Sequence, residues 1–390
     1  MARFLLAGGG TGGHLVPGLS LARSLAARGA ELHLVRSGRA VENDFLKELD
    51  SLDPRMAVHE IPWHGRGVLL PFLLARSLVP AHRLIRSVKP DVVVGLGGGG
   101  GLTCLVAAWR RGIPFVLLEQ NVVPGKANRL MARFARRVYT AFPDTVKAFA
   151  GRSAVWSGMP LRPGLGRPAE AARSAAALGR RLGFDPSKTL LLVLGGSQGA
   201  RALNEAVPGL VASLPDELKE GVAVVHISGR GNERSTARAW GEASTEAHIL
   251  PFCVEMEALY SAADLVLCRG GGTTLHELAA AGRPSIIVPY PWHRDRHQYA
   301  NAEWFEERGA SRVLEQDQLT GGGGLCLLIE LLSDASARRR MGASARRSLP
   351  LDAGTRISAE LESLASGGKQ TSEEPHSRGR TRRQEEAGAR

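Results

Sequence analysis

Short apolar runs alternate along the chain with glycine-rich segments and with stretches of helical periodicity. Runs of strand length are Arg3–Ala7, Glu31–Val35, Asp91–Gly95, Pro114–Glu119, Val138–Ala141, Thr189–Leu194, Val222–Ile227, Ile249–Phe252, Ala263–Leu267 and Ser285–Pro289. Continuous apolar strands between helices are typical of parallel sheets that are covered on both faces. The pattern therefore predicts an α/β fold with two doubly wound, Rossmann-like halves, in which Val138–Ala141 is the last strand of the first half.

The segments between these runs predict helices and domain boundaries. Expected helices are Leu19–Ala27, Gly166–Arg180, Ala258–Ala263, Leu325–Leu332, Ala335–Leu349 and Ala353–Leu364. We expect a first domain over residues 1–158, a linker at Gly158–Pro163, a second domain over residues 163–350 and a final helix over 351–365. Residues 366–390 are charged and poor in apolar side chains, so we expect them to be disordered.

The stretch from Cys268 to Ala302 combines a strand end, glycines and polar residues. Gly270–Gly272 follow the strand, and the spacing of Leu275 and Leu278 predicts a helix that starts at about Thr274. A helix N-terminus after a glycine loop is a site for phosphate, because its first N–H groups are unpaired and its dipole is positive there. The sequence therefore predicts a diphosphate cradle at this helix start.

Glu277 has two interpretations in this stretch. Thr274-x-x-Glu277 matches a capping box, in which each side chain bonds the other residue's backbone N–H. Alternatively, the carboxylate lies one turn from a bound phosphate and accepts hydrogen bonds from a ribose diol. The two roles are compatible.

A second glycine loop, Gly8 to Gly18, follows the first strand. Gly8-x-Gly10-x-x-Gly13 matches the dinucleotide fingerprint, but Arg36 and Ser37 stand where an NAD site has an acidic residue, which argues against NAD. His14 closes this loop. It is either a solvent-exposed residue at a helix start or a general base whose pKa is lowered by the positive helix end.

Composition and length are those of a two-domain globular protein. The 390 residues suggest two domains, and 44% apolar with 23% charged residues is ordinary for a globular protein. The four cysteines have no metal or disulfide spacing, which favours a reduced cytoplasmic setting. Met1–Ala7 is too short for a signal peptide, and we find no apolar run of membrane-spanning length.

A net charge of +12 predicts an anionic partner. Few aromatic residues accompany the arginines and no nucleic-acid motif is present, so phosphates and an anionic membrane surface are favoured over nucleic acid. Residues Trp63 to Arg86 are basic and amphipathic, and Trp109, Arg110 and Arg111 could extend the same surface. The alternative for this segment is a core helix with a solvated basic face.

Four motifs occur together and in order: GGGTGGH near the start, EQN at Glu119–Asn121, GGSQGA at Gly195–Ala200, and the run from Cys268 to Ala302. In these motifs the chain resembles the MurG family of peptidoglycan glycosyltransferases, part of glycosyltransferase family 28. The resemblance implies a GT-B fold, in which two Rossmann-like domains face a cleft. It also implies UDP-GlcNAc in the C-terminal domain, lipid I on the N-terminal domain against the anionic inner leaflet, and a last helix that returns to the first domain.

The same resemblance implies a role for each matching residue. His14 is the candidate base, Thr11, Gly12 and Gly13 approach the donor diphosphate, and Asn121, Arg162 and Ser197 line the donor side. Cys253 stands where the family's backbone contacts uracil. The implied phosphate cradle is Gly272, Thr273, Thr274, Leu275, His276 and Glu277, with Glu277 on the ribose. His297 and Gln298 read the sugar hydroxyls.

The implied reaction is inverting transfer of GlcNAc to the 4-hydroxyl of MurNAc in lipid I, which forms lipid II for peptidoglycan and so serves cell wall synthesis, cell shape and division. We expect no cofactor and no metal, since the chain has no Asp-x-Asp ligand pair. The implied location is peripheral, on the cytoplasmic face of the inner membrane.

Two alternatives to this reaction stay open. Gly99 to Cys104 reads GGGLTC, where the family usually has an aromatic-x-Ser-Gly-Pro loop on the acceptor side. The first alternative is therefore a UDP-sugar transferase that acts on another lipid, such as diacylglycerol. The second is a catalytically silent subunit that binds a nucleotide sugar.

Overall fold

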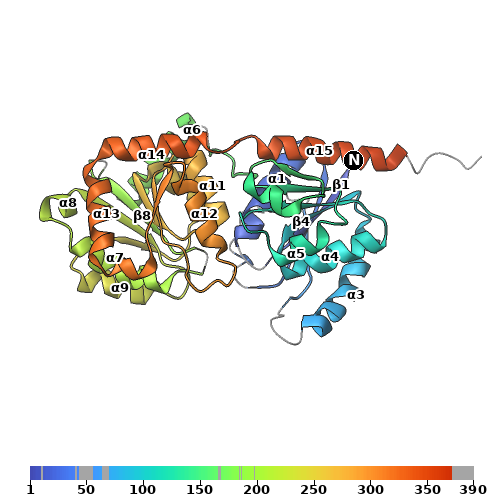
Figure 1. Ribbon diagram of the computed structural model, residues 1–390, viewed down its shortest axis with the longest axis horizontal. Coiled ribbons are helices and arrows are strands. Elements are labelled where there is room, and N and C mark those ends of the chain that lie inside the picture. Colours follow the sequence, from blue (N-terminus) through green and yellow to red (C-terminus); the bar gives the residue numbers. More distant parts are fainter. Residues whose placement is uncertain are drawn as a thin grey trace, which may run out of the picture.

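The computed structural model of the protein has two α/β domains side by side (Figure 1). It describes residues 1–390 except 10–11, 40–41, 44–55, 64–69, 166–167, 184, 186, 197 and 371–390. Each domain has a parallel sheet with helices on both faces, so the predicted pair of doubly wound domains is confirmed. No helix within the described residues is both long and apolar enough to cross a bilayer.

The N-terminal sheet has the strand order β3-β2-β1-β4-β5-β6-β7. Its strands are β1 (Arg3–Gly8), β2 (Glu31–Arg36), β3 (Ala57–Glu60), β4 (Val92–Gly97), β5 (Phe115–Glu119), β6 (Arg137–Thr140) and β7 (Ala154–Trp156). The helices of this domain are α1 (Gly12–Ala26), α3 (Leu70–Val88), α4 (Gly98–Arg110), α5 (Lys126–Met131) and the 3₁₀ helix η2 (Asp144–Phe149). The order reverses between β1 and β4, which places a ligand-binding switch point at the start of α1.

The C-terminal sheet has the order β10-β9-β8-β11-β12-β13. Its strands are β8 (Thr189–Leu194), β9 (Val222–Ile227), β10 (His248–Leu250), β11 (Leu265–Cys268), β12 (Ser285–Ile287) and β13 (Ser311–Val313). Its helices are α6 (Pro168–Leu182), α7 (Arg201–Ala212), α8 (Asp216–Glu220), α9 (Glu233–Glu242), α10 (Met256–Ala262), α11 (Gly272–Ala281), α12 (His297–Glu306), η3 (Gln316–Leu319), α13 (Gly322–Ser333) and α14 (Ala335–Arg347). The switch point of this sheet lies between β8 and β11, where α11 begins.

The last helix, α15 (Ala353–Gln370), lies along the N-terminal domain (Figure 1). Ala353, Ile357 and Leu361 are buried in the same core as Phe4, on the α1 side of the sheet. The helix continues to Gln370, so the prediction of disorder from residue 366 was wrong for its first five residues. The remainder, 371–390, lies outside the described residues.

Other boundaries differ from the prediction as well, and those near the cavity are the most important. The sheet of the first half ends with β7, which was not predicted because a three-residue strand is too short to stand out in the sequence. Gly98–Gly101 begin α4, a helix that was not predicted, and α1 begins at Gly12 rather than Leu19. Clustered glycines hide helix starts from a periodicity argument, because they contribute no side-chain pattern.

An aromatic side chain from the first domain is buried in the core of the second. Phe142 follows β6, is fully buried, and meets the rings of Trp304 and Phe305 edge-on, with centroids 5.1 and 5.9 Å away. The Trp304 indole Nε1 donates to the Asp144 carboxylate at 3.0 Å. Apolar packing and a partly buried polar contact together hold the two domains in one arrangement.

The start of α11 approaches the first domain more closely still. A Cβ added at Gly272 would lie 2.2 Å from the Gln120 carbonyl oxygen, which is backbone and has little freedom to move. Only glycine fits this contact. The close approach thus brings the switch points of the two sheets together.

Gly272→Ala is expected to lower the free energy of unfolding by about 1–3 kcal/mol, because overpacking forces the domain interface apart. Chemical unfolding followed by circular dichroism measures this. Gly209→Ala, within α7 where nothing lies within 4 Å of the added Cβ, is the matched control and should be neutral or stabilising. An equal effect of both substitutions would contradict the close-contact account.

Candidate active site

A cavity of about 490 Å³ lies between the domains, beyond the carboxyl ends of the strands in both sheets. From the first domain it is lined by the start of α1 and by Gln120 and Asn121. The second domain contributes the glycine segment after β8, the Phe252–Met256 segment and the start of α11. Both sheets therefore present their switch points to one space, as expected for a ligand site in this class of fold.

Two helix N-termini border this cavity. Gly12 and Gly13 begin α1, and Gly272, Thr273 and Thr274 begin α11, with no side chain capping the α11 start. Both positive dipole ends thus border the same space, which favours an anionic group between them.

A hydrogen bond ties the two helix starts together, and Pro17 makes it available. Proline has no N–H, so Pro17 leaves the Gly13 carbonyl, four residues earlier in α1, without its usual partner within the helix. The Thr273 hydroxyl donates to this carbonyl at 2.8 Å. The carbonyl of α1 that lacks a partner within its own helix thus accepts a hydrogen bond from the other domain.

Glu277 is held by two side chains instead of by a capping box. The helix begins at Gly272, with Gly271 as its N-cap, so the predicted box at Thr274 was wrong. The Arg162 Nε donates to Glu277 Oε1 at 2.9 Å, and the Tyr260 hydroxyl donates to Oε2 at 3.1 Å. All three side chains line the cavity and are at most 5% exposed. A buried carboxylate requires such partners to remain charged.

His14 lies in the first turn of α1 at the cavity wall, and it is half-buried, so the solvent-exposed interpretation was wrong. Its ring packs against Gly97, where an added Cβ would lie 2.8 Å from Cδ2 and where φ is 98°. Burial first, and then positive charge on His297, lower the pKa of His14 to about 4. The imidazole is therefore neutral at physiological pH and can accept a proton.

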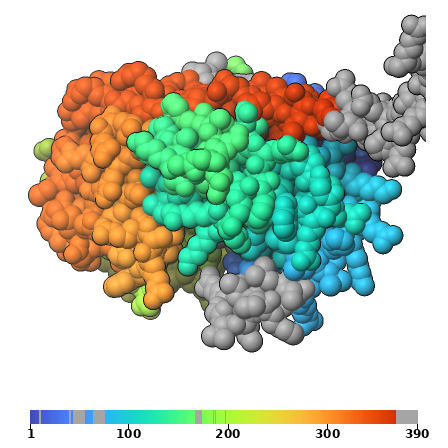
Figure 2. Space-filling model, turned by 45° about the vertical axis from the view of Figure 1, so that its right-hand side comes forward, coloured from blue at the N-terminus to red at the C-terminus, as the bar shows by residue number. Residues whose placement is uncertain are grey.

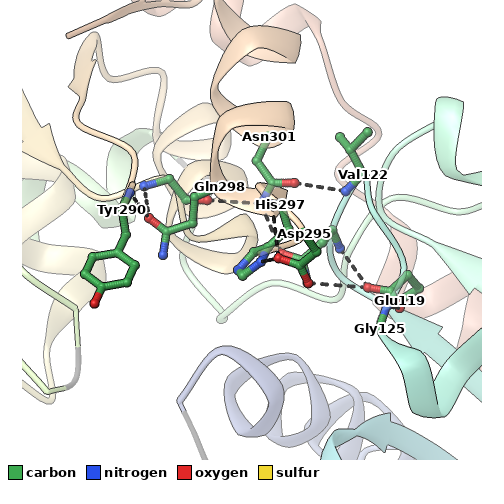
Figure 3. Close-up of polar contacts among 10 residues, drawn as sticks. Glu119, Val122, Gly125, Tyr290, Asp295, His297, Gln298 and Asn301 are labelled. Carbon is green, nitrogen blue, oxygen red and sulfur yellow. Dashed lines mark hydrogen bonds and ion pairs between the residues drawn. The ribbon is translucent and has the colours of Figure 1, made fainter. Parts of the chain in front are cut away.

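Gln298 and His297 begin α12 and are each fixed by neighbours (Figure 3). Gln298 Oε1 accepts from the Gly270 N–H at 3.2 Å and the Tyr290 N–H at 3.0 Å. This fixes the amide plane, so that the NH₂ group is the end available to donate. His297 Nδ1 pairs with Asp295 Oδ1 at 2.7 Å. Both side chains line the cavity.

Asn301 connects α12 to the loop after β5 (Figure 3). Its side chain is fully buried; Oδ1 accepts from the Val122 N–H at 2.9 Å, and Nδ2 donates to Asn121 Oδ1 and to the Gly270 carbonyl, both at 3.0 Å. Asn121, one of the predicted donor-side residues, is therefore held in place from the other domain.

The Glu119 carboxylate shapes the same loop from below (Figure 3). It accepts from the backbone N–H groups of Asn121 and Gly125, both at 3.0 Å, and from Asn128 Nδ2 at 2.9 Å. Burial raises the pKa of this carboxyl, and the hydrogen bonds oppose that rise. Glu119 thus organises the loop that carries Asn121 to the cavity.

The remaining predicted residues divide into three groups. Cys253 lines the cavity beside Phe252 and Met256. Leu275 is in the domain core, and His276 faces the domain interface, with Nδ1 2.8 Å from the Gly272 carbonyl and Nε2 3.2 Å from the Ala141 carbonyl; neither side chain lines the cavity. Thr11 and Ser197 lie outside the described residues.

Tyr260 and Arg269 also line the cavity, although neither was predicted from the sequence. Tyr260 is on α10, which has an ordinary apolar helix pattern, so nothing in the local sequence marked its hydroxyl as functional. Arg269 directly follows β11, and its position at a strand's carboxyl end was an available signal.

The arrangement can hold an anion between two helix ends and a diol near a buried carboxylate, and it places a neutral base in the first turn of α1. Among the described residues, no group of three or more His, Cys, Asp and Glu side chains has a metal-binding arrangement. These features match a nucleoside diphosphate compound as the ligand.

Comparisons with known proteins agree with this site. The family model of the glycosyltransferase family 28 N-terminal domain matches residues 4–140, and that of the C-terminal domain matches residues 190–347. A protein of Chromohalobacter salexigens is 39% identical over 361 residues, which cover 92% of this chain and 96% of that protein. Its name is UDP-N-acetylglucosamine--N-acetylmuramyl-(pentapeptide) pyrophosphoryl-undecaprenol N-acetylglucosamine transferase.

Solved structures agree as well. The crystal structure of MurG from Acinetobacter baumannii has a TM-score of 0.68 and 27% identity, and covers 93% of this chain and 99% of that one. The calicheamicin glycosyltransferase, at 18% identity and a TM-score of 0.64 over 94% of this chain and 99% of that one, shares the GT-B fold. The chain belongs to glycosyltransferase family 28 and, within it, to the MurG family.

Proposed function

We propose that this protein transfers GlcNAc from UDP-GlcNAc to the 4-hydroxyl of MurNAc in undecaprenyl-pyrophosphoryl-MurNAc-pentapeptide, with inversion at the anomeric carbon. The observation that carries the proposal is the pair of helix N-termini, α1 and α11, that border one cavity with Glu277 close by. The relatives at 39% identity, whose names describe this transfer, support the same donor and acceptor.

The donor lies mainly on the C-terminal domain in this proposal. Its diphosphate is between the starts of α1 and α11, its ribose meets Glu277, and its uracil lies along Phe252 and Cys253. Gln298 donates its amide NH₂ to a sugar hydroxyl, since its amide oxygen already accepts from two backbone N–H groups. Thr11, Ser197 and Arg162 are included as donor-side residues, Arg162 through its bond to Glu277.

The acceptor hydroxyl attacks the anomeric carbon as the bond to the UDP oxygen breaks. His14 takes the proton from the attacking hydroxyl, because its imidazole is neutral at physiological pH. Negative charge develops on the β-phosphate of the leaving UDP, and the two helix ends stabilise it without having to reorganise. In this proposal the start of α1 contributes both the base and part of the charge stabilisation, and the start of α11 contributes the rest.

The test of this proposal is release of UDP from UDP-GlcNAc by the purified chain, with and without a short-chain lipid I analogue. We expect release that depends on the analogue, with little release in its absence. A protein that binds UDP-GlcNAc but releases no UDP with lipid I would contradict the proposal. Release with diacylglycerol instead would indicate a different lipid acceptor.

His14→Ala is expected to lower kcat by about 10²–10⁴-fold while changing donor affinity much less, because the base acts only in the transition state. With a pKa of about 4, His14 keeps its basic form as the pH falls from 7 to 5, so its acid limb in kcat/KM should lie near pH 4. Equal losses in kcat and affinity would contradict this assignment. An acid limb near 6.5 that disappears in the variant would support His14 as the base but contradict its lowered pKa.

We also propose a membrane-facing surface on the N-terminal domain, which would make the protein peripheral on the cytoplasmic face of the inner membrane. The surface, called here the α3–α5 patch, lies where α3, α4 and α5 adjoin on one face (Figure 2). Its exposed apolar side chains are Val79, Trp109, Leu130 and Phe134. Its exposed basic side chains are Arg76, Arg83, Arg110, Arg111, Arg129 and Arg133.

Contacts join the members of the α3–α5 patch. Trp109 and Phe134 have ring centroids 4.5 Å apart, Arg133 lies over the Phe134 ring at 5.4 Å, and Arg111 reaches His82 on α3 at 3.3 Å. Exposed aromatic rings surrounded by arginines match the headgroup region of an anionic bilayer. Trp63, expected in this surface, is buried, and Arg66 and Leu69 lie outside the described residues.

Replacing Trp109 and Phe134 together by serine should weaken binding to vesicles that contain phosphatidylglycerol by at least ~10-fold, because the apolar part of the contact is lost. Co-sedimentation with vesicles measures this. Trp292→Ser, which removes a more exposed tryptophan from the C-terminal domain, is the matched control and should bind normally. Undiminished binding of the double variant would rule out the α3–α5 patch as the docking face.

A further inference from the structure

Tyr260 is a buried hydroxyl donor whose partner is the Glu277 carboxylate. The side chain comes from α10, is 3% exposed and lines the cavity. Burial first, and then the charge of Glu277, raise the pKa of its phenol well above the ordinary value. The hydroxyl therefore keeps its proton at any physiological pH and acts toward Glu277 as a donor.

The two oxygens of the Glu277 carboxylate have separate partners. Oε1 accepts from the Arg162 Nε, and Oε2 accepts from the Tyr260 hydroxyl. A carboxylate held at one oxygen can still turn about its terminal torsion, which is broad for glutamate. Partners at both oxygens fix its plane as well as its position.

We propose that Tyr260 is a positioning residue for nucleotide recognition, which sets the Glu277 carboxylate in the orientation that accepts hydrogen bonds from the ribose 2′- and 3′-hydroxyls. The inference rests on the proposed function for the identity of the ligand as a uridine diphosphate sugar. Beyond the proposed function, the inference assigns a role to Tyr260 on α10. This role is to give the site its preference for a ribose with an intact diol.

Arg162 and Tyr260 have different tasks in this account. Arg162 belongs to the segment between the domains and also donates to the Val254 carbonyl at 3.1 Å, and its positive charge pairs with the Glu277 carboxylate. Tyr260 is neutral, and its hydrogen bond only orients the Glu277 carboxylate. Removing Arg162 would leave a buried charge without compensation, whereas removing the Tyr260 hydroxyl leaves the ion pair intact.

The selectivity follows from the number of acceptor sites on a carboxylate. An ionised carboxylate has about four lone-pair sites, so a ribose diol can bond Glu277 while both protein partners stay in place. A nucleotide without these hydroxyls would leave buried acceptor sites unpaired in the complex. Leaving such a group unsatisfied weakens binding more than omitting a contact does.

Calorimetric titration of the full-length protein with UDP and with 2′,3′-dideoxyuridine diphosphate tests the proposal. We expect the wild type to prefer UDP by about 100-fold, and Tyr260→Phe to reduce this preference to about 10-fold, on the scale of hydrogen bonds to a charged group. The whole loss should appear in the affinity for UDP, with the affinity for the dideoxy nucleotide changed less than about twofold.

Tyr139→Phe is the matched control. It removes another buried tyrosine hydroxyl, which donates to Glu360 at 2.9 Å on the N-terminal domain, and it should leave both affinities unchanged. Thermal unfolding of both variants shows that each is folded before titration.

Three results would overturn the proposal. These are equal affinity of the wild type for both nucleotides, an equal loss for both in Tyr260→Phe, or no loss for either. The second would mean that Tyr260 only packs the site. The titration needs no acceptor, so a chain that binds nucleotides with the expected preference but transfers no sugar would contradict the transferase proposal alone.

Discussion

The contact between the start of α11 and the first domain is the constraint on which the cavity depends. Gly272 lies so close to the Gln120 carbonyl that a methyl group has no room, and the Thr273 hydroxyl bonds the Gly13 carbonyl that Pro17 leaves available. Phe142 strengthens this arrangement by packing into the second core. The N-termini of α1 and α11, which belong to different domains, therefore border the same cavity. Neither domain could form this cavity alone.

The electrostatics of the site follow from this placement. The helix ends supply positive potential without a mobile side chain, so a diphosphate can bind and its developing charge can be stabilised by groups that are already in place. Glu277 is the opposite case, a buried negative charge that is tolerated because Arg162 pairs with it and Tyr260 donates to it. His14 stays neutral because burial and the nearby His297 both disfavour its charged form. Anion binding, diol binding and proton removal thus occupy separate parts of one cavity.

The sequence predicted the fold well and the details of the site less well. Most strands are apolar runs that suit a parallel sheet covered on both faces, and glycine loops after β1, β8 and β11 correctly marked the switch points. Helix starts within glycine clusters were placed too late, which produced the incorrect capping box at Thr274. The partners of Glu277 could not be found from sequence, because Arg162 and Tyr260 lie 115 and 17 residues away and meet it only through the tertiary fold.

A crystal structure of the protein with UDP-GlcNAc tests the central claim most directly. The account predicts that the diphosphate lies between the N-termini of α1 and α11, with the ribose diol on Glu277 and the uracil beside Phe252 and Cys253. A donor bound within the C-terminal domain with its diphosphate away from both helix starts would contradict the account. So would a ribose whose hydroxyls make no contact with Glu277.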